Sequence, residues 1–155
     1  MPPKVNPLSE PVYRLPHLEF IRATESTSFG KALALMRKAR AGSVLVCRAG
    51  RLVGWLNQRR ILEKFAVESV PAKTPLRELM ARNPITLAPQ ATVAEAAALM
   101  RRENLRGLPI VDDKGRALGL VTVTRIVRHV AAHFPSEVMN LPPQTGRHVE
   151  QAEGA

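Results

Sequence analysis

The chain has 155 residues, which is enough for one compact domain with a shared core and short for two independent ones. Its one cysteine excludes an intramolecular disulfide, and no apolar run approaches a membrane span of roughly 18 residues or a signal-peptide stretch, so we expect a cytoplasmic protein without membrane contact. The formal net charge of +10 favours polyanionic partners, although the basic residues are scattered and form no basic tail.

The first expected elements follow an N-terminal extension, which we assign to residues 1–17. They are a helix from about Ser28, a strand at 43–47, a turn at Ala49-Gly50, a strand at 51–56 and a helix to about Val67. Cys47 lies in an apolar run, which predicts a buried strand residue. Trp55, on the second strand, is expected to pack in the core or in a dimer, with stacking on a base as the weaker alternative.

The second half of the chain begins with a connecting segment in which Thr74 as N-cap and Pro75 at the first helical position predict a short helix. Thr92 and Glu95 then form a capping box, so a helix is expected from there to about Asn104. The remaining elements are apolar strands at 108–111 and 117–123, a turn at 113–115 between them, and a last helix from about 123 to 133.

The two halves repeat each other with a period of about 65 residues. The string ALALMR at 32–37 differs at one position from AAALMR at 96–101, and VCRAGRLVG at 46–54 aligns with VDDKGRALG at 111–119. Gly54 is thereby paired with Gly119. The sequence therefore predicts two copies of one supersecondary unit, at 18–70 and 71–133.

The second copy resembles a cystathionine-beta-synthase (CBS) repeat in its Pro-Ile-Thr opening, its Pro-Ile-Val-Asp strand and its Gly-hydrophobic-Val-Thr strand end. The segment at 18–67 resembles a more divergent copy, so the resemblance covers roughly 115 of the 155 residues. It implies an α/β (α+β) fold in which two repeats, each a small sheet with flanking helices, pack with pseudo-twofold symmetry. It also implies adenosyl-ligand clefts between the repeats and dimerisation into a disc of four repeats.

The family pattern ends its second strand in Gly-h-h-Ser/Thr-x-x-Asp, in which the hydroxyl caps the next helix and the carboxylate contacts the ribose. The matching positions here are Thr122 with Arg125 and Asn57 with Arg60. A guanidinium has donors but no acceptor, so the usual ribose contact is lost. Arginines beside two capped helix starts are instead expected to form a phosphate or sulfate site. The open alternative is that both arginines point into water and the clefts hold no ligand.

The sequence therefore favours a regulatory module without catalytic residues, which binds AMP, ATP, S-adenosylmethionine or another phosphate-bearing ligand and signals to an unknown protein partner. The residues expected at the cleft are Ile21, Val44, Asn57 and Arg60 from the first repeat, and Ile85, Thr86, Pro109, Thr122 and Arg125 from the second. One alternative is a ligand-free structural or dimerisation module. Another is a nucleic-acid binder, against which the scattered arginines and the lack of a helix-turn-helix signature argue.

A homodimer is predicted from the repeat architecture, with Ala32, Ala96 and Ala97 expected near the surface. His129 and His133 lie four residues apart on the last helix, but no third ligand is near them in the sequence, so no metal site is predicted. The tail at 134–155 is rich in proline and polar residues. The apolar residues of its first half are expected to dock on the body or a second subunit, and its last ten residues to be mobile; the apolar residues are Phe134, Val138, Met139 and Leu141.

Overall fold

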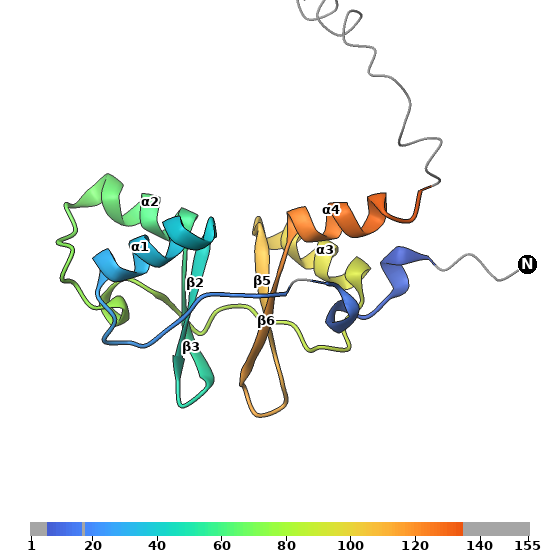
Figure 1. Cartoon of the computed structure of the whole chain (residues 1–155), viewed down its shortest axis with the longest axis horizontal. Helices are drawn as coiled ribbons and strands as arrows, with labels where there is room; N and C mark the ends of the chain where they lie inside the picture. The colour runs from blue at the N-terminus through green and yellow to red at the C-terminus, as the bar shows by residue number, and fades with distance from the viewer. Residues whose placement is uncertain (1–5, 17, 135–155) are drawn as a thin grey trace, which may run out of the picture.

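The computed structural model describes residues 6–16 and 18–134 of the chain. Two units of one hairpin and two helices stand side by side, with the helices at one end and the hairpin tips at the other (Figure 1). The tail that we expected to dock lies outside the described residues, apart from Phe134, which is exposed. Within the described part of the chain, no helix has both the length and the apolar character needed to cross a bilayer.

Both units contain the predicted elements in the predicted order. The first unit consists of β1 (Arg22–Ala23), α1 (Phe29–Ala39), β2 (Ser43–Arg48), β3 (Arg51–Asn57) and α2 (Gln58–Val67). The second consists of β4 (Ala81–Arg82), α3 (Val93–Glu103), β5 (Gly107–Val111), β6 (Ala117–Thr122) and α4 (Val123–Ala131). Three short 3-10 turns precede or join the units, namely η1 (Pro7–Ser9), η2 (Val12–Arg14) and η3 (Leu76–Glu78).

The helices α1 and α3 begin and end alike because the sequence repeats their capping signals. Ser28 caps α1, and Thr92 and Glu95 form the predicted capping box of α3. At the other ends, Arg40 and Asn104 adopt the left-handed conformation, with φ of 52° and 53°. This conformation reverses the chain, so that it enters β2 and β5 directly.

The expected helix between the units is a single 3-10 turn, η3, and the assignment of Thr74 as its cap is wrong. The residue before the turn is Pro75, which makes no side-chain capping bond. The backbone of this segment is bonded to the first unit instead, since the Leu76 N–H donates to the Thr27 oxygen at 2.9 Å and the Arg77 N–H donates to the Glu25 oxygen at 3.0 Å. These bonds hold the chain against the loop before α1 and prevent further helical turns.

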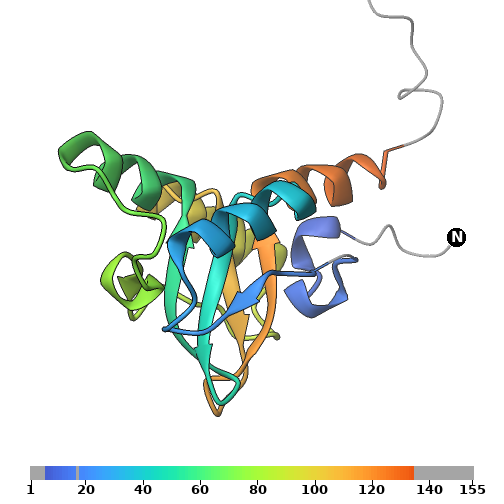
Figure 2. The same cartoon turned by 60° about the vertical axis from the view of Figure 1, so that its left-hand side comes forward.

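The strands form a four-stranded sheet in the order β1-β2-β3-β4 and a hairpin of β5 and β6. The hairpins contact each other at equivalent positions: the Leu52 N–H donates to the Gly115 oxygen at 2.9 Å, and the Ala117 N–H donates to the Gly50 oxygen at 3.1 Å. Because each position in one bond lies 65 residues from its counterpart in the other, the pair defines the predicted pseudo-twofold axis. Figure 2 shows the hairpins packed against each other.

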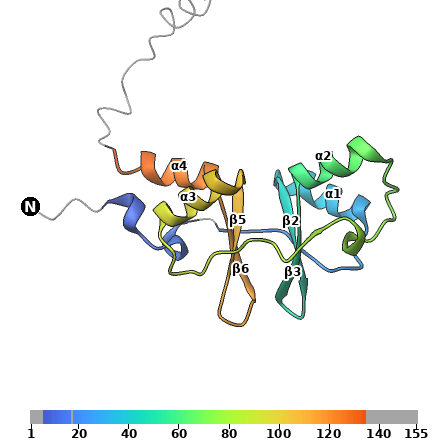
Figure 3. The same ribbon diagram turned by 180° about the vertical axis from the view of Figure 1, so that it is seen from behind.

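Two chain segments cross between the units on opposite faces. The segment before β1 crosses in front in Figure 1, and the segment that contains β4 crosses in front in Figure 3. β4 pairs with β3 of the first unit, while the Leu120 N–H on β6 donates to the Leu18 oxygen at 3.1 Å. The hairpin of each unit is therefore extended by a segment of the other unit, β4 on the first hairpin and the segment around Leu18 on the second, which ties the two units into one body.

Each unit has its own apolar core, and a third cluster joins them. Val12 and Leu15, from the segment that we assigned to the N-terminal extension, belong to the core of the second unit. Cys47 lies in the joining cluster and is buried as predicted, and this burial raises the pKa of its thiol. The expectation that Ala32 and Ala96 lie near the surface is wrong, because both are fully buried beneath their own helices.

Candidate ligand-binding cleft

A cavity of about 570 Å³ lies between the two units at the helical end of the hairpins. Its volume is within the range of small-molecule sites, which is about 300–1,000 Å³. Both repeats contribute the start of their first strand with the residues just before it, their second strand and the cap of the following helix, and the first repeat adds the first two turns of α2. The residues are Gly42, Ser43, Trp55, Asn57, Gln58, Arg59, Leu62 and Glu63 from the first repeat, and Asn104, Leu105, Arg106, Gly107, Leu120 and Thr122 from the second.

The starts of α2 and α4 meet at this cavity. Asn57 and Thr122 line it, and their side chains cap the two helices by accepting from the amides of Arg60 at 2.8 Å and Arg125 at 3.2 Å. Both caps use the side-chain oxygen that the sequence predicted. Two helix N-termini contribute positive partial charge at the same place, which favours an anion there.

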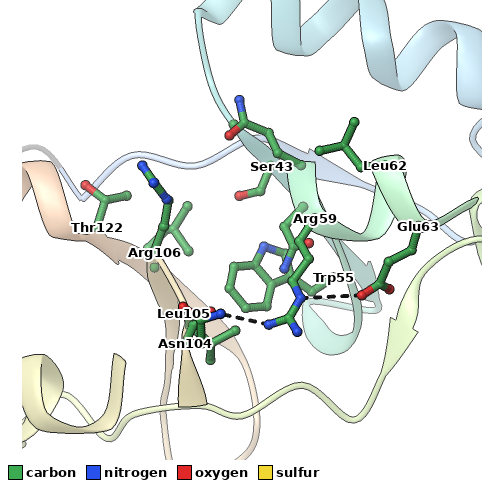
Figure 4. A pocket seen from close by; sticks show the side chains of 14 residues that line it. Ser43, Trp55, Arg59, Leu62, Glu63, Asn104, Leu105, Arg106 and Thr122 are labelled. Atoms are coloured by element: carbon green, nitrogen blue, oxygen red, sulfur yellow. Dashed lines mark hydrogen bonds and ion pairs between the residues drawn. The ribbon is translucent and has the colours of Figure 1, made fainter. Parts of the chain in front are cut away.

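Two guanidinium groups add full positive charge to the lining. Arg59 reaches from α2 across to the second repeat, where its NH1 lies 3.4 Å from the Asn104 oxygen, and its Nε lies 3.4 Å from a Glu63 carboxylate oxygen. Arg106 lines the cavity from the second repeat, beside Thr122 in the view of Figure 4. Sequence reasoning missed both residues, because each lies outside the strand-end motif and scattered arginines carry no spacing signal.

Trp55 forms part of the cavity wall between the two repeats. Its side chain is 5% exposed, and its indole N–H has no hydrogen-bond partner among the described residues. A buried donor without a partner costs about 1–3 kcal/mol, so it is a feature that needs an explanation. The residue is a core residue, as predicted, and its edge also borders the cleft.

Of the nine residues expected at the cleft, the structure places only Asn57 and Thr122 in the lining of this cavity. Val44 and Pro109 are fully buried in their strands. Ile85 and Thr86 lie in the segment that crosses between the units, and Ile21 lies just before β1, packed against the core of the first unit.

The two arginines of the strand-end motif lie in the first turns of their helices and outside the cavity lining. The guanidinium of Arg60 is bound within the chain, since its Nε donates to the Leu79 oxygen at 2.9 Å and its NH1 lies 3.8 Å from Glu63. Arg125 is half-buried at the start of α4. The predicted helix caps border this cavity, but the arginine of α2 in its lining is Arg59, next to the expected Arg60.

A comparison with known protein families decides the fold family. The model of the CBS domain matches residues 12–67 and 76–132, which together cover most of the chain. The chain belongs to the CBS domain family. It is a tandem CBS pair, and the two matched segments each contain one hairpin with its flanking helices.

Similar proteins include an uncharacterised protein of Methanocaldococcus jannaschii, 30% identical over 107 residues that make up 68% of this chain and 25% of the relative. The chain thus spans about a quarter of that relative's length. A CBS domain pair solved with methylthioadenosine and S-adenosyl-L-methionine is 28% identical, with a TM-score of 0.68 over 76% of this chain and 97% of that one. The cytosolic domain of the Mg²⁺ channel MgtE, solved with ATP, is 26% identical, with a TM-score of 0.61 over 72% of this chain and 45% of that one.

Proposed function

We propose that the CBS pair is a regulatory module that binds an adenine nucleotide or another phosphate-bearing adenosyl ligand in the cleft between its repeats. One observation carries the proposal: two capped helix starts and two guanidinium groups, those of Arg59 and Arg106, converge on one cavity of about 570 Å³. The complexes of similar CBS domains with S-adenosyl-L-methionine and with ATP support this ligand class.

The two parts of such a ligand have different partners in the cleft. Phosphate oxygens accept from the arginines and lie near the positive ends of the helices. The base packs on Trp55 and on the leucines of the lining, Leu62, Leu105 and Leu120. Because no lining carboxylate replaces the family's ribose contact except Glu63, which is paired with Arg59, we assign the recognition mainly to the phosphate and the base.

Ligand binding changes a contact that joins the two repeats. In this structure the Arg59 guanidinium reaches from α2 to the backbone carbonyl oxygen of Asn104. A bound phosphate would compete with that oxygen and with Glu63 for the guanidinium. Exposed pairs of this kind are worth about 0–1 kcal/mol, so a phosphate can displace them. The module would thereby transmit occupancy to a protein partner through the relative position of α2 and the second repeat.

The test is a thermal shift assay of the whole chain with AMP, ATP, S-adenosylmethionine, adenosine and inorganic phosphate. A ligand at a hundred times its dissociation constant stabilises the fold by about 2.7 kcal/mol. We expect phosphate-bearing adenosyl ligands to stabilise the chain more than adenosine does. Arg59→Gln and Arg106→Gln should weaken this effect, Glu63→Gln should strengthen it, and Arg37→Gln, on the exposed side of α1, should leave it unchanged. A flat melting temperature across the panel contradicts the proposal.

We also propose that the module is a homodimer, with α2 and α4 at the interface. These helices lie on the same end of the molecule and expose large apolar side chains that include Leu62 at 70%, Phe65 at 48% and Val127 at 60%. A second copy that covers both helices removes this surface from water. Analytical ultracentrifugation should show a dimer that Leu62→Glu and Val127→Glu convert to a monomer. A monomeric wild-type chain contradicts the proposal.

A further inference from the structure

Three side chains that are distant in the sequence meet at the far side of the second repeat. Glu10 lies beside His129 and His133 of α4, and the potential ligand atoms of the three residues all lie within 4.8 Å of one another. His129 Nε2 is 3.2 Å from Glu10 Oε2, and His133 Nε2 is 3.7 Å from Glu10 Oε1. Glu10 is the third ligand that was absent from the sequence neighbourhood of the two histidines.

The backbone holds this group in place independently of the three side chains. The Val93 N–H donates to the backbone carbonyl oxygen of Glu10 at 2.9 Å, and the Val12 N–H donates to the backbone carbonyl oxygen of Ala91 at 2.8 Å. These bonds fix the N-terminal segment on the start of α3, while Ile126 anchors α4 in the core of the same unit. The two histidines, four residues apart, face the segment from one side of the helix.

The hydrogen bonds of His133 determine which of its nitrogens is available. Its Nδ1 lies 2.8 Å from the His129 carbonyl oxygen, which can only accept, so Nδ1 carries the proton. The Nε2 of the neutral ring therefore has a free lone pair on the side of Glu10. A backbone carbonyl that holds the second ring nitrogen is the usual arrangement behind a metal-bound histidine.

The other histidine is the more buried of the pair, with 9% of its side chain exposed. Its Nε2 lies 3.2 Å from the Pro7 oxygen as well as 3.2 Å from Glu10. Both neighbours are acceptors, so this nitrogen carries a proton in the metal-free chain. On metal binding the Nε2 proton would leave to solvent and Nδ1 would take one up, so that the neutral ring offers its Nε2 lone pair to the ion, and the Pro7 oxygen would accept from a metal-bound water.

We propose that Glu10, His129 and His133 bind a divalent metal ion, and that zinc fits best. Zinc takes imidazole nitrogens and carboxylate oxygens at 2.0–2.2 Å in tetrahedral geometry, which places its ligand atoms about 3.3 Å apart. The Nε2 atoms of His129 and His133 lie 3.2 Å and 3.7 Å from the two Glu10 carboxylate oxygens, close to that value, and all potential ligand atoms lie within 4.8 Å of one another. Three protein ligands leave the fourth position for water. The ion would join the N-terminal segment to α4, and the start of α4 borders the ligand cleft.

The test is a calorimetric titration of the whole chain with zinc chloride, alongside the visible absorption of the cobalt-loaded protein. We expect one zinc ion per chain and a tetrahedral cobalt spectrum. Glu10→Gln and His133→Gln should each weaken zinc binding at least tenfold. The matched controls are Glu103→Gln, a half-exposed carboxylate of the same repeat, and His148→Gln, and both should bind zinc as the wild type does.

Thermal melts without zinc separate loss of the site from loss of the fold. His133 is 32% exposed, so His133→Gln should melt within a few degrees of the wild type and still lose zinc. Zinc should also slow hydrogen exchange at the amides of Val12 and Val93 in the wild type and not in His133→Gln. Absence of zinc binding, or equal affinity in wild type and both ligand variants, overturns the proposal and leaves Glu10 and His129 as a polar contact between side chains only.

Discussion

Replacement of Gly54 by alanine tests how the crossing strand β4 is seated on the first repeat. A Cβ at this position would meet the Met80 side chain, with Cγ at 2.7 Å, Cβ at 3.1 Å and Sδ closer still. Met80 is 4% exposed and packed in the core of the first unit, so it has little room to withdraw. Overpacking of this kind costs about 1–3 kcal/mol, and we expect Gly54→Ala to lose stability in that range.

The assay is urea denaturation of the wild type, Gly54→Ala, Met80→Ala and the double variant. Met80→Ala alone leaves a cavity and should cost about 2–5 kcal/mol. In the double variant the new methyl group has space, so the double loss should be smaller than the sum of the single losses by about 1 kcal/mol or more. Gly42→Ala is the control, because its Cβ would meet only the exposed Gln58 side chain, at 3.3 Å. Additive losses, or an unchanged midpoint in Gly54→Ala, would refute the reasoning.

Two further predictions concern the turns that shape the repeats. Thr122→Ala removes the cap of α4 and should cost about 1 kcal/mol, whereas Thr122→Ser keeps the hydroxyl and should cost little, as measured by thermal denaturation; equal losses would contradict the assignment of the cap. The pKa of Asp112 is lowered, chiefly because its carboxylate accepts from the backbone N–H of Arg116. The ionised carboxylate therefore stabilises the fold at pH values above its unfolded pKa of about 3.9. This stabilisation is lost as the pH falls through the lower pKa of the folded state. The stability difference between the wild type and Asp112→Asn should therefore narrow below about pH 4, and a constant difference would contradict it.

The fold could be predicted from the sequence because its signals are local and occur twice. The capping residues Ser28 and Thr92 mark the helix starts, and the aligned Gly54 and Gly119 mark the strand positions where a crossing segment lies closest. At Gly119 a Cβ would meet the Leu18 Cβ at 2.9 Å, just as at Gly54 it would meet Met80. The two aligned glycines thus mark equivalent positions at which a crossing segment packs against a strand, although the sequence alone does not identify that segment.

The details of the cleft could be predicted only in part. Asn57 and Thr122 were found because a cap is a local feature of the chain. Arg59 was missed because a choice between two adjacent arginines depends on where each side chain finds a partner, and Arg60 finds the Leu79 carbonyl. Glu10 was missed as a neighbour of the two histidines because more than a hundred residues separate them.

The error about Ala32 and Ala96 has a similar origin. Small residues on a helix indicate close packing, but they do not say whether the partner is the chain's own sheet or a second subunit. Both residues pack inward, and the most exposed apolar side chains, those of Val67, Leu62 and Val127, belong instead to the two helices that follow the hairpins. Exposure is a property of the assembled fold, so a single-sequence pattern could not assign it.

The most direct measurement of the central claim is a titration of the wild-type chain with AMP, followed by the fluorescence of Trp55. This residue is the only tryptophan of the chain and lies in the wall of the cleft, so the whole tryptophan emission comes from a residue that borders the cavity. We expect a saturable change with AMP that is weaker with adenosine and reduced at least tenfold in affinity by Arg59→Gln. Unchanged fluorescence up to millimolar AMP, together with the absence of calorimetric heat, would contradict the account of a nucleotide-binding cleft.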